Sequence, residues 1–142
     1  MTRNLIVIGC AVLLAFGLSF GSFAGASPDT DVDGVPDAFD NCTALANGPS
    51  AATNSCNSQE DYDVDGYGQP CDADINNDGL NGLDDVNIML GNLGGPAAQA
   101  SNLNCDALIA LDDVNIALGT IGGAPGPTGL SCAGTGTPCN AQ

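Results

Sequence analysis

The chain has 142 residues, of which 17 are Asp or Glu and one, Arg3, is basic; it contains neither Lys nor His. This balance excludes nucleic acid and anionic membrane surfaces as partners, because recognition of phosphate depends on Lys and Arg. It also excludes an imidazole base or a Schiff-base amine, so we predict that the chain is not an enzyme. Aromatic residues make up only 4% and Trp is absent, which makes a large packed core hard to build.

Residues 1–26 have the pattern of a secretory signal peptide. One positive charge at Arg3 precedes an apolar run from Leu5 to Phe20, and Ala24-Gly25-Ala26 supplies the small residues of a cleavage site. The alternative, a permanent membrane helix, is less favoured because the run is shorter than the roughly 20 residues that span a bilayer. We expect a secreted protein, extracellular or at the bacterial cell surface, with no membrane contact after cleavage.

Six cysteines remain once Cys10 is removed with the signal: Cys42, Cys56, Cys71, Cys105, Cys132 and Cys139. An even set in a small exported chain predicts disulfides. The sequence leaves the pairing open, and nearness along the chain favours sequential bonds, which are Cys42 to Cys56, Cys71 to Cys105 and Cys132 to Cys139. A zinc site is disfavoured, since the chain has no His and no CxxC.

An internal repeat lies in the second half of the chain. Residues Leu83–Gly91 are echoed 28 positions later by Leu111–Gly119, which indicates a duplicated unit. Each copy predicts a short helix with an apolar stripe; the stripes are Val86, Met89, Leu90 and Leu93, and Val114, Ala117, Leu118 and Ile121. Gly-Gly pairs at 94–95 and 122–123 end the helices. Neither helix is long enough to be stable alone, so we expect the two to pack together.

Four acidic segments repeat the spacing of a loop that wraps a calcium ion. Such a loop of about twelve residues offers side-chain oxygens at positions 1, 3, 5, 9 and 12, a carbonyl at position 7 and a turn glycine at position 6. Bound divalent cations would also neutralise carboxylates that have no basic partner in the chain. We therefore expect about three to four Ca²⁺ ions.

The predicted ligands follow these positions in each loop. In the first loop they are Asp29, Asp31, Asp33, Val35 (carbonyl), Asp37 and Asp40. In the second they are Asp61, Asp63, Asp65, Tyr67 (carbonyl), Gln69 and Asp72. In the third they are Asp74, Asn76, Asp78, Leu80 (carbonyl) and Asp85. In the fourth they are Asn102, Asn104, Asp106, Leu108 (carbonyl) and Asp113, with Ala107 in place of the turn glycine.

The number of carboxylates and the turn glycine predict the order of affinity. The first two loops should bind most tightly, the third less tightly, and the fourth weakly or not at all. One alternative is that these segments are solvated acidic linkers, but three loops with the correct glycine and an acid at position 12 argue against it. Magnesium is a weaker candidate than calcium because it keeps its waters.

Two family resemblances follow from these residues. The segments 29–42 and 59–72 resemble thrombospondin type 3 repeats, which are calcium-wrapped, nearly irregular and stapled by disulfides. Segments 74–93 and 102–121 resemble the paired loop-helix units of a dockerin domain. The second resemblance implies a cohesin-like scaffold as partner, although Leu83-Asp84 and Leu111-Asp112 stand where cellulosomal dockerins often carry Ser-Thr.

The sequence thus predicts a small, loop-rich fold stabilised by calcium and disulfides, mostly coil with short α-helices. We expect a signal peptide (1–26), a thrombospondin type 3-like segment (27–73), a pair of EF-hand-like loop-helix units (74–122) and a Gly/Pro-rich, cysteine-containing tail (123–142). The predicted function is a secreted calcium-binding structural or adhesive module with an unknown protein or glycan partner at the cell surface. The alternative is a dockerin-type assembly module of an extracellular polysaccharide-degrading system.

Overall fold

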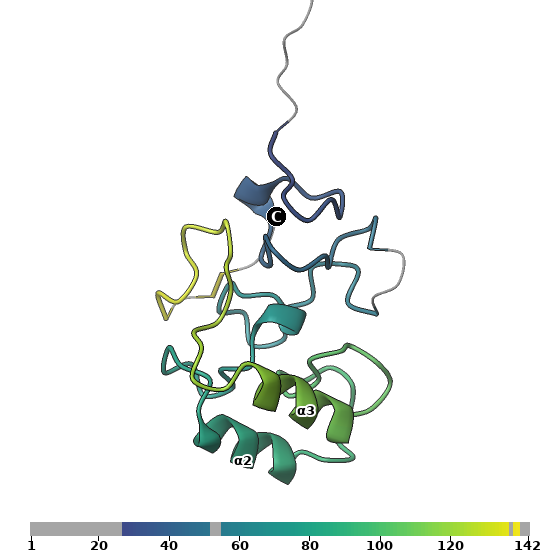
Figure 1. The fold of residues 1–142 in the computed structure, drawn as a ribbon, viewed down its shortest axis with the longest axis vertical. Helices are drawn as coiled ribbons and strands as arrows, with labels where there is room; N and C mark the ends of the chain where they lie inside the picture. The colour runs from purple at the N-terminus through teal and green to yellow at the C-terminus, as the bar shows by residue number, and fades with distance from the viewer. Residues whose placement is uncertain (1–26, 52–54, 137, 140–142) are drawn as a thin grey trace, which may run out of the picture.

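The protein is a mostly irregular chain with two short helices at one end. A computed structural model describes residues 27–51, 55–136 and 138–139, so the expected signal peptide lies outside the described residues. The helices are α2 (Leu83–Gly91) and α3 (Leu111–Gly119), and two 3-10 turns, η2 (Asp37–Phe39) and η3 (Gln69–Cys71), precede them. The described ranges contain no β-strand, only an isolated bridge between Pro96 and Leu108. The molecule is elongated, with both helices below the loops of the first half (Figure 1).

The predicted small, loop-rich, disulfide-stabilised fold with short helices is confirmed. No helix in the described part of the chain has the length and apolar character needed to cross a membrane.

The carboxylate that closes the third or the fourth acidic loop lies in the first turn of the helix that follows. Asp85 accepts a hydrogen bond from the backbone N–H of Gly82 at 2.7 Å, and Asp113 accepts one from Ala110 at 2.8 Å. These bonds satisfy backbone donors that a helix start leaves free, and the negative charges lie at the favourable end of the helix dipole. The last acidic residue of each of these two loops therefore also caps the N-terminus of the helix that follows.

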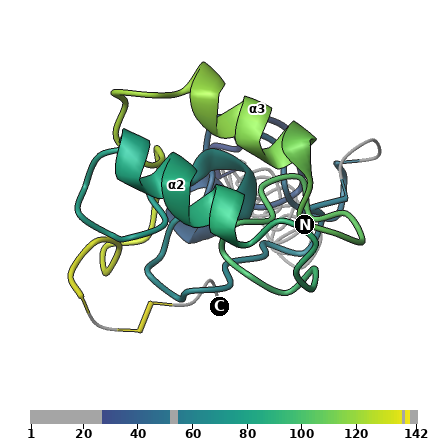
Figure 2. The ribbon, with the colours of Figure 1, turned by 90° about the horizontal axis from the view of Figure 1, so that it is seen from below.

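The duplicated units pair with an approximate two-fold relation, and α2 and α3 lie side by side (Figure 2). The Gly94 N–H donates to the Ile109 carbonyl at 2.9 Å, and 28 residues later the Gly122 N–H donates to the Asn81 carbonyl at 2.8 Å. The return bonds run from Ile109 N–H to Gly95 at 3.5 Å and from Asn81 N–H to Gly123 at 2.8 Å. Each loop is thus bonded to the end of the other unit's helix.

The hydrophobic core is small and lies between the two helices. Its buried members are Ala73, Val86, Met89, Leu103, Val114 and Ala117. Half of each predicted apolar stripe is in this core. The prediction was wrong for Leu90, Leu93, Leu118 and Ile121, which are 40–46% exposed. Two helices packed in one layer bury only the facing half of each stripe, and none of the described segments covers the rest.

Only one of the three expected disulfides has the pairing that nearness along the chain suggested. Cys132 is bonded to Cys139 as expected, whereas the other two predictions were wrong, since the bonds are Cys42 to Cys71 and Cys56 to Cys105. The second loop folds back on the exit of the first, where the Gly68 N–H donates to the Asn41 carbonyl at 2.9 Å. This contact brings Cys71 beside Cys42, and the other bond joins residue 56 to the fourth loop.

We expect Met89→Ala to destabilise the fold by roughly 2–5 kcal/mol, because Met89 is fully buried between the helices and its truncation leaves a cavity. Leu90→Ala is the matched control, since the neighbouring Leu90 is 46% exposed and should lose less than about 1 kcal/mol. Urea unfolding followed by circular dichroism measures both. Equal losses would contradict this placement of the core.

Candidate metal centres

The four acidic loops share one backbone conformation. The residue at position 4 has a left-handed φ in every loop: Val32 at 63°, Val64 at 64°, Asn77 at 59° and Cys105 at 52°. The position-5 carboxylate accepts from the position-7 N–H in every loop: Val35 to Asp33 at 2.8 Å, Tyr67 to Asp65 at 2.9 Å, Leu80 to Asp78 at 3.1 Å and Leu108 to Asp106 at 2.9 Å. The register read from the sequence therefore corresponds to a repeated local structure.

The turn glycines complete that structure in three loops only. Gly34, Gly66 and Gly79 have φ values of 94°, 96° and 93°, a region that L side chains rarely adopt. Ala107 holds this position in the fourth loop and is not among the residues with positive φ. The fourth loop thus turns differently at its midpoint.

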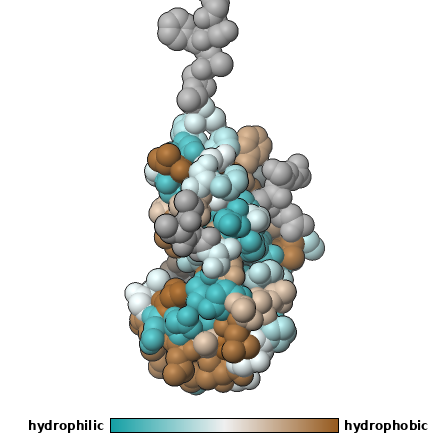
Figure 3. All heavy atoms as spheres, turned by 90° about the vertical axis from the view of Figure 1, so that its right-hand side faces the viewer, coloured by the Kyte–Doolittle hydropathy of each residue, from teal (hydrophilic) through white to brown (hydrophobic). Residues whose placement is uncertain are grey.

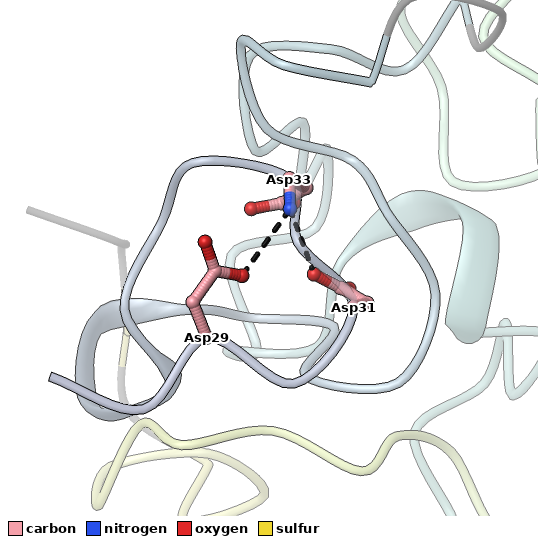
Figure 4. A group of neighbouring side chains, drawn as sticks. All are labelled: Asp29, Asp31 and Asp33. Carbon is pink, nitrogen blue, oxygen red and sulfur yellow. Dashed lines mark hydrogen bonds between the residues drawn. The ribbon is translucent and has the colours of Figure 1, made fainter. Parts of the chain in front are cut away.

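In the first loop, Asp29, Asp31 and Asp33 converge (Figure 4). Each offers an oxygen, and these oxygens lie within 4.8 Å of one another. Oxygens that bind one calcium ion at 2.3–2.6 Å can be at most about 5 Å apart. The spacing of the three carboxylates is therefore compatible with binding to a single ion.

Backbone donors hold these carboxylates in place. The Asp33 N–H lies 3.2 Å from an oxygen of Asp29 and 3.3 Å from an oxygen of Asp31, and the Gly34 N–H donates to Asp29 at 3.1 Å. Asp33 is fully buried and accepts from the backbone N–H of Asn47 at 2.8 Å and from that of Gly48. Backbone groups of the chain thus set the positions of the three carboxylates.

Two oxygens in this loop have no protein partner. Asp31 Oδ2 and Asp40 Oδ2 are buried without a hydrogen bond, and Asp40 is fully buried as a residue. Burial raises the pKa of Asp31, and the nearby Asp33 and Asp40 raise it further. Burial also raises the pKa of Asp40. A buried carboxylate oxygen without a partner is costly, and a bound cation would supply the missing interaction.

A buried network of side-chain amides positions Asp40. Gln59 donates to Asp40 Oδ1 at 2.9 Å and to Asn47 Oδ1 at 2.5 Å, and it accepts from the Asn41 N–H at 2.8 Å. Asn47 in turn donates to Asn41 Oδ1 at 2.7 Å. Sequence reasoning missed all three amide residues. All three lie between the first and second acidic loops, where amide residues are common, so the sequence carries no specific signal for them.

The second loop contains the two carboxyl groups whose pKa values are raised most, Asp63 and Asp72. Oxygens of Asp61, Asp63 and Asp65 also lie within 4.8 Å of one another. Burial, together with the hydrogen bond to Asp61 and its charge, raises the pKa of Asp63 to about 6. Burial first, and then the charges of Asp65 and Asp63, raise the pKa of Asp72 to about 9. Without a bound cation, these raised pKa values favour the protonated form of Asp63 and Asp72 over a wider pH range than is usual for Asp.

The position-9 side chains in these two loops have other partners. Asp37 accepts from the Thr30 N–H at 2.7 Å and from its hydroxyl at 2.8 Å, which closes the first loop at its base. The amide of Gln69 accepts from the Tyr62 N–H at 3.3 Å and donates to the Ala100 carbonyl. Both residues stabilise the shape of their loops.

The third and fourth loops are more open. Among the described residues, neither contains three acidic groups within the distance found in the first two. In the third loop, Asp74 accepts from the N–H groups of Asp78 at 3.0 Å and Gly79 at 2.6 Å, and Asp85 accepts from Asn76 at 3.0 Å. In the fourth loop, Asp113 accepts from the Asn104 N–H at 3.2 Å, which reproduces the bond from Asn76 to Asp85.

Position 1 distinguishes these two loops. The side-chain amide of Asn102 in the fourth loop donates hydrogen bonds to the carbonyls of Ala97 at 2.8 Å and Asp106 at 3.0 Å. Its buried Oδ1 has no hydrogen-bond partner. The equivalent Asp74 accepts hydrogen bonds from its own loop with both oxygens. The fourth loop therefore has one carboxylate fewer and a different central turn.

The second and third loops face each other across a cavity of about 530 Å³, which the tail borders. Four carboxylates line it, and they are Asp63, Asp65, Asp74 and Asp78. Because the chain has no Lys or His and its single Arg is Arg3, no basic side chain of the described ranges offsets these charges.

Comparison with family models, with curated proteins and with solved structures finds no match to this chain.

The raised pKa values predict how the metal-free fold responds to pH. A carboxyl whose pKa is higher in the folded state binds more protons there than in the unfolded chain, so stability decreases as pH rises. The pH range over which stability is lost begins at about 4, the ordinary pKa of an Asp side chain. It ends at about 9 for Asp72 and at about 6 for Asp63. In a chelator such as EDTA, we expect the melting temperature to fall steadily between these limits.

Asp72→Asn is the control variant, since it removes the carboxyl group that has the highest pKa in the second loop. Its melting temperature in chelator should change little above about pH 7, where Asp63 is already ionised. A melting temperature of the parent protein that is constant or rises with pH in chelator would contradict the crowding of charge in the second loop.

Proposed function

We propose that this chain is a secreted calcium-binding structural or adhesive module whose acidic loops fold around Ca²⁺. The observation that carries the proposal is the first loop, where converging carboxylates leave two buried oxygens, Asp31 Oδ2 and Asp40 Oδ2, without a partner. Calcium is a hard cation that takes six to eight oxygen ligands, and this loop offers only oxygens.

In the proposed sites, the carboxylates at positions 1, 3, 5 and 12 bind the ion. In the first loop these are Asp29, Asp31, Asp33 and Asp40, and in the second they are Asp61, Asp63, Asp65 and Asp72, with the carbonyls of Val35 and Tyr67 at position 7. The bound ion supplies positive charge at the centre of each loop. Its charge offsets the burial and the neighbouring carboxylates that raise the pKa of Asp63 and Asp72.

We expect the four loops to fill in a definite order. The first two loops gather three carboxylate oxygens each and should bind most tightly. The third has the same backbone turn with fewer gathered charges and should follow. The fourth, which has Asn102 at position 1 and Ala107 at position 6, should bind weakly or not at all.

The family interpretation is part of the proposal. The first half is interpreted as thrombospondin type 3-like repeats, in keeping with its irregular backbone and the disulfide from Cys42 to Cys71 that joins its two loops. The second half is interpreted as a dockerin-like pair, in keeping with the two-fold bonding of its loop-helix units. Export through residues 1–26 would place the module outside the cell.

Isothermal titration calorimetry of the EDTA-treated mature chain tests the calcium proposal. We expect at least two tight sites, and Asp40→Asn should weaken one of them by about tenfold or more, because it replaces a charged ligand by a neutral one. Asp112→Asn makes the same charge change at an exposed residue outside the ligand positions and should leave the tight sites unchanged. A titration without heat of binding, or equal effects of the two variants, would reject the proposal.

One observation favours the second candidate function, a dockerin-type assembly module. Leu83 and Leu111 occupy loop position 10 in the third and fourth loops and are 68% and 63% exposed, and Leu90 and Leu118 follow seven residues later at 46% each. Apolar side chains gather at the helical end of the molecule (Figure 3). Exposed apolar clusters are typical of surfaces that bind a partner.

A pull-down with immobilised cohesin domains distinguishes this candidate. If the apolar side chains dock such a scaffold, the parent chain is captured in calcium, and Leu83→Ser combined with Leu111→Ser lowers capture by about tenfold or more. Val32→Ser is the control, since Val32 is 76% exposed in the first loop, far along the sequence from the helices. Absence of capture of the parent chain would leave the structural module as the function.

A further inference from the structure

The tail is not a free coil but a strap against the second acidic loop; we define the strap as residues 124–136 and 138–139. It donates hydrogen bonds to three consecutive carbonyls of that loop. The Cys139 N–H donates to Val64 at 2.8 Å, the Gly134 N–H to Asp65 at 3.0 Å, and the Thr128 hydroxyl to Gly66 at 2.9 Å. These carbonyls belong to positions 4, 5 and 6, where the loop makes its turn.

The ring closed by Cys132 and Cys139 lies directly on the turn glycine. A Cβ added to Gly66 would be 2.5 Å from the Cys139 sulfur and 2.8 Å from Ala133 Cα. The equivalent Gly79 of the third loop has nearly the same φ, and nothing lies within 4 Å of its added Cβ. The close packing at Gly66 is thus a property of the strap and not of the loop conformation.

The strap also holds the ends of the first two loops. The Gly129 N–H donates to the Asp40 carbonyl at 2.8 Å, and the Gly126 N–H donates to the Cys71 carbonyl at 3.0 Å. Asp40 is position 12 of the first loop, and Cys71 directly precedes position 12 of the second. The strap therefore fixes the turn and the exit of the second loop together.

We propose that the strap is a clamp that sets the ion affinity of the second loop, and that the Cys132–Cys139 ring makes this affinity depend on the thiol–disulfide state. The inference rests on the proposed calcium binding. A loop held in its binding conformation loses less conformational entropy when the ion binds. Opening the ring frees the backbone N–H groups that donate to Val64 and Asp65. The loop then loses more conformational entropy when the ion binds, and its affinity for the ion falls.

The coupling has to act in both directions. If the closed ring strengthens ion binding, the bound ion must stabilise the closed ring by the same factor. When a dithiol such as dithiothreitol opens the ring, the sulfur–sulfur bond accepts two electrons and two protons and becomes two thiols, while the dithiol closes to its own disulfide. Calcium should shift this exchange toward the closed ring.

The chain offers a local reporter for the second loop. Its two tyrosines, Tyr62 and Tyr67, both lie in that loop, and Trp is absent. Terbium bound beside a tyrosine emits light when the tyrosine side chain is excited. Titrating the EDTA-treated mature chain with terbium therefore reports ion binding at this loop. A saturable signal that calcium displaces is the expected result for the parent protein.

The variants then test the clamp. We expect Thr128→Val to raise the terbium midpoint about fivefold to tenfold, since it removes the hydroxyl that donates to the Gly66 carbonyl. The double variant Cys132→Ser with Cys139→Ser should raise it by a similar factor, since it removes the disulfide that closes the ring. Thr128→Ser keeps the hydroxyl, and Ser131→Ala removes an exposed hydroxyl from the same strap, so both should stay within about twofold of the parent. Retained helical circular dichroism shows that each variant is folded.

The outcomes separate the two proposals. Parent-like midpoints for both Thr128→Val and the double variant would overturn the clamp and leave calcium binding intact. No saturable terbium signal from the parent would overturn calcium binding at this loop and the clamp with it. Mass spectrometry of the alkylated thiols gives the reciprocal test, and a ring that dithiothreitol opens equally in calcium and in EDTA would also overturn the clamp.

Discussion

The structure is governed by carboxylates that have no basic partners. The chain has 17 acidic residues and one basic residue, and acids lie close together in its interior, as the buried Asp72 and the half-buried Asp63 and Asp65 do. Bringing like charges together in a medium of low polarity is costly. Most globular domains offset buried acids with Lys or Arg, which is not available to the described residues, so the proposed function assigns that role to bound ions.

Because the apolar cluster between the helices contains six buried residues among those the structure describes, other interactions must fix the positions of the loops. Backbone N–H groups hold the carboxylates, and the half-buried amide of Gln59 donates a hydrogen bond to Asp40. Disulfides join the first loop to the second and residue 56 to the fourth loop. Polar bonds and cross-links thus have the role that side-chain packing has in larger domains, which makes the fold depend on the chemical environment: on pH, on thiols and, as proposed, on calcium.

The two ends of the molecule differ in surface chemistry. The loop end presents acidic turns, whereas the helical end presents Leu83, Leu111 and their neighbours to solvent. The two-fold relation between the loop-helix units repeats this apolar surface on both helices. Under the proposed function, the loop end would supply ion-dependent rigidity and the helical end a surface for attachment.

The sequence alone determined what is local. The Asp spacing and the turn glycines indicated where the repeated loop conformation begins in each segment, since most bonds within the loops join residues two to nine positions apart. Helical periodicity located α2 and α3 for the same reason, and the bond from Cys132 to Cys139 is also local.

Only the tertiary structure decided the other two disulfides, the amide network around Asp40, the exposed half of each helix stripe and the strap. These features join segments far apart in sequence; the Thr43 side chain, for example, bonds to Pro127 across 84 positions. The strap acts mainly through backbone N–H and carbonyl groups, which nearly every residue carries, so its contacts leave almost no trace in the choice of side chains.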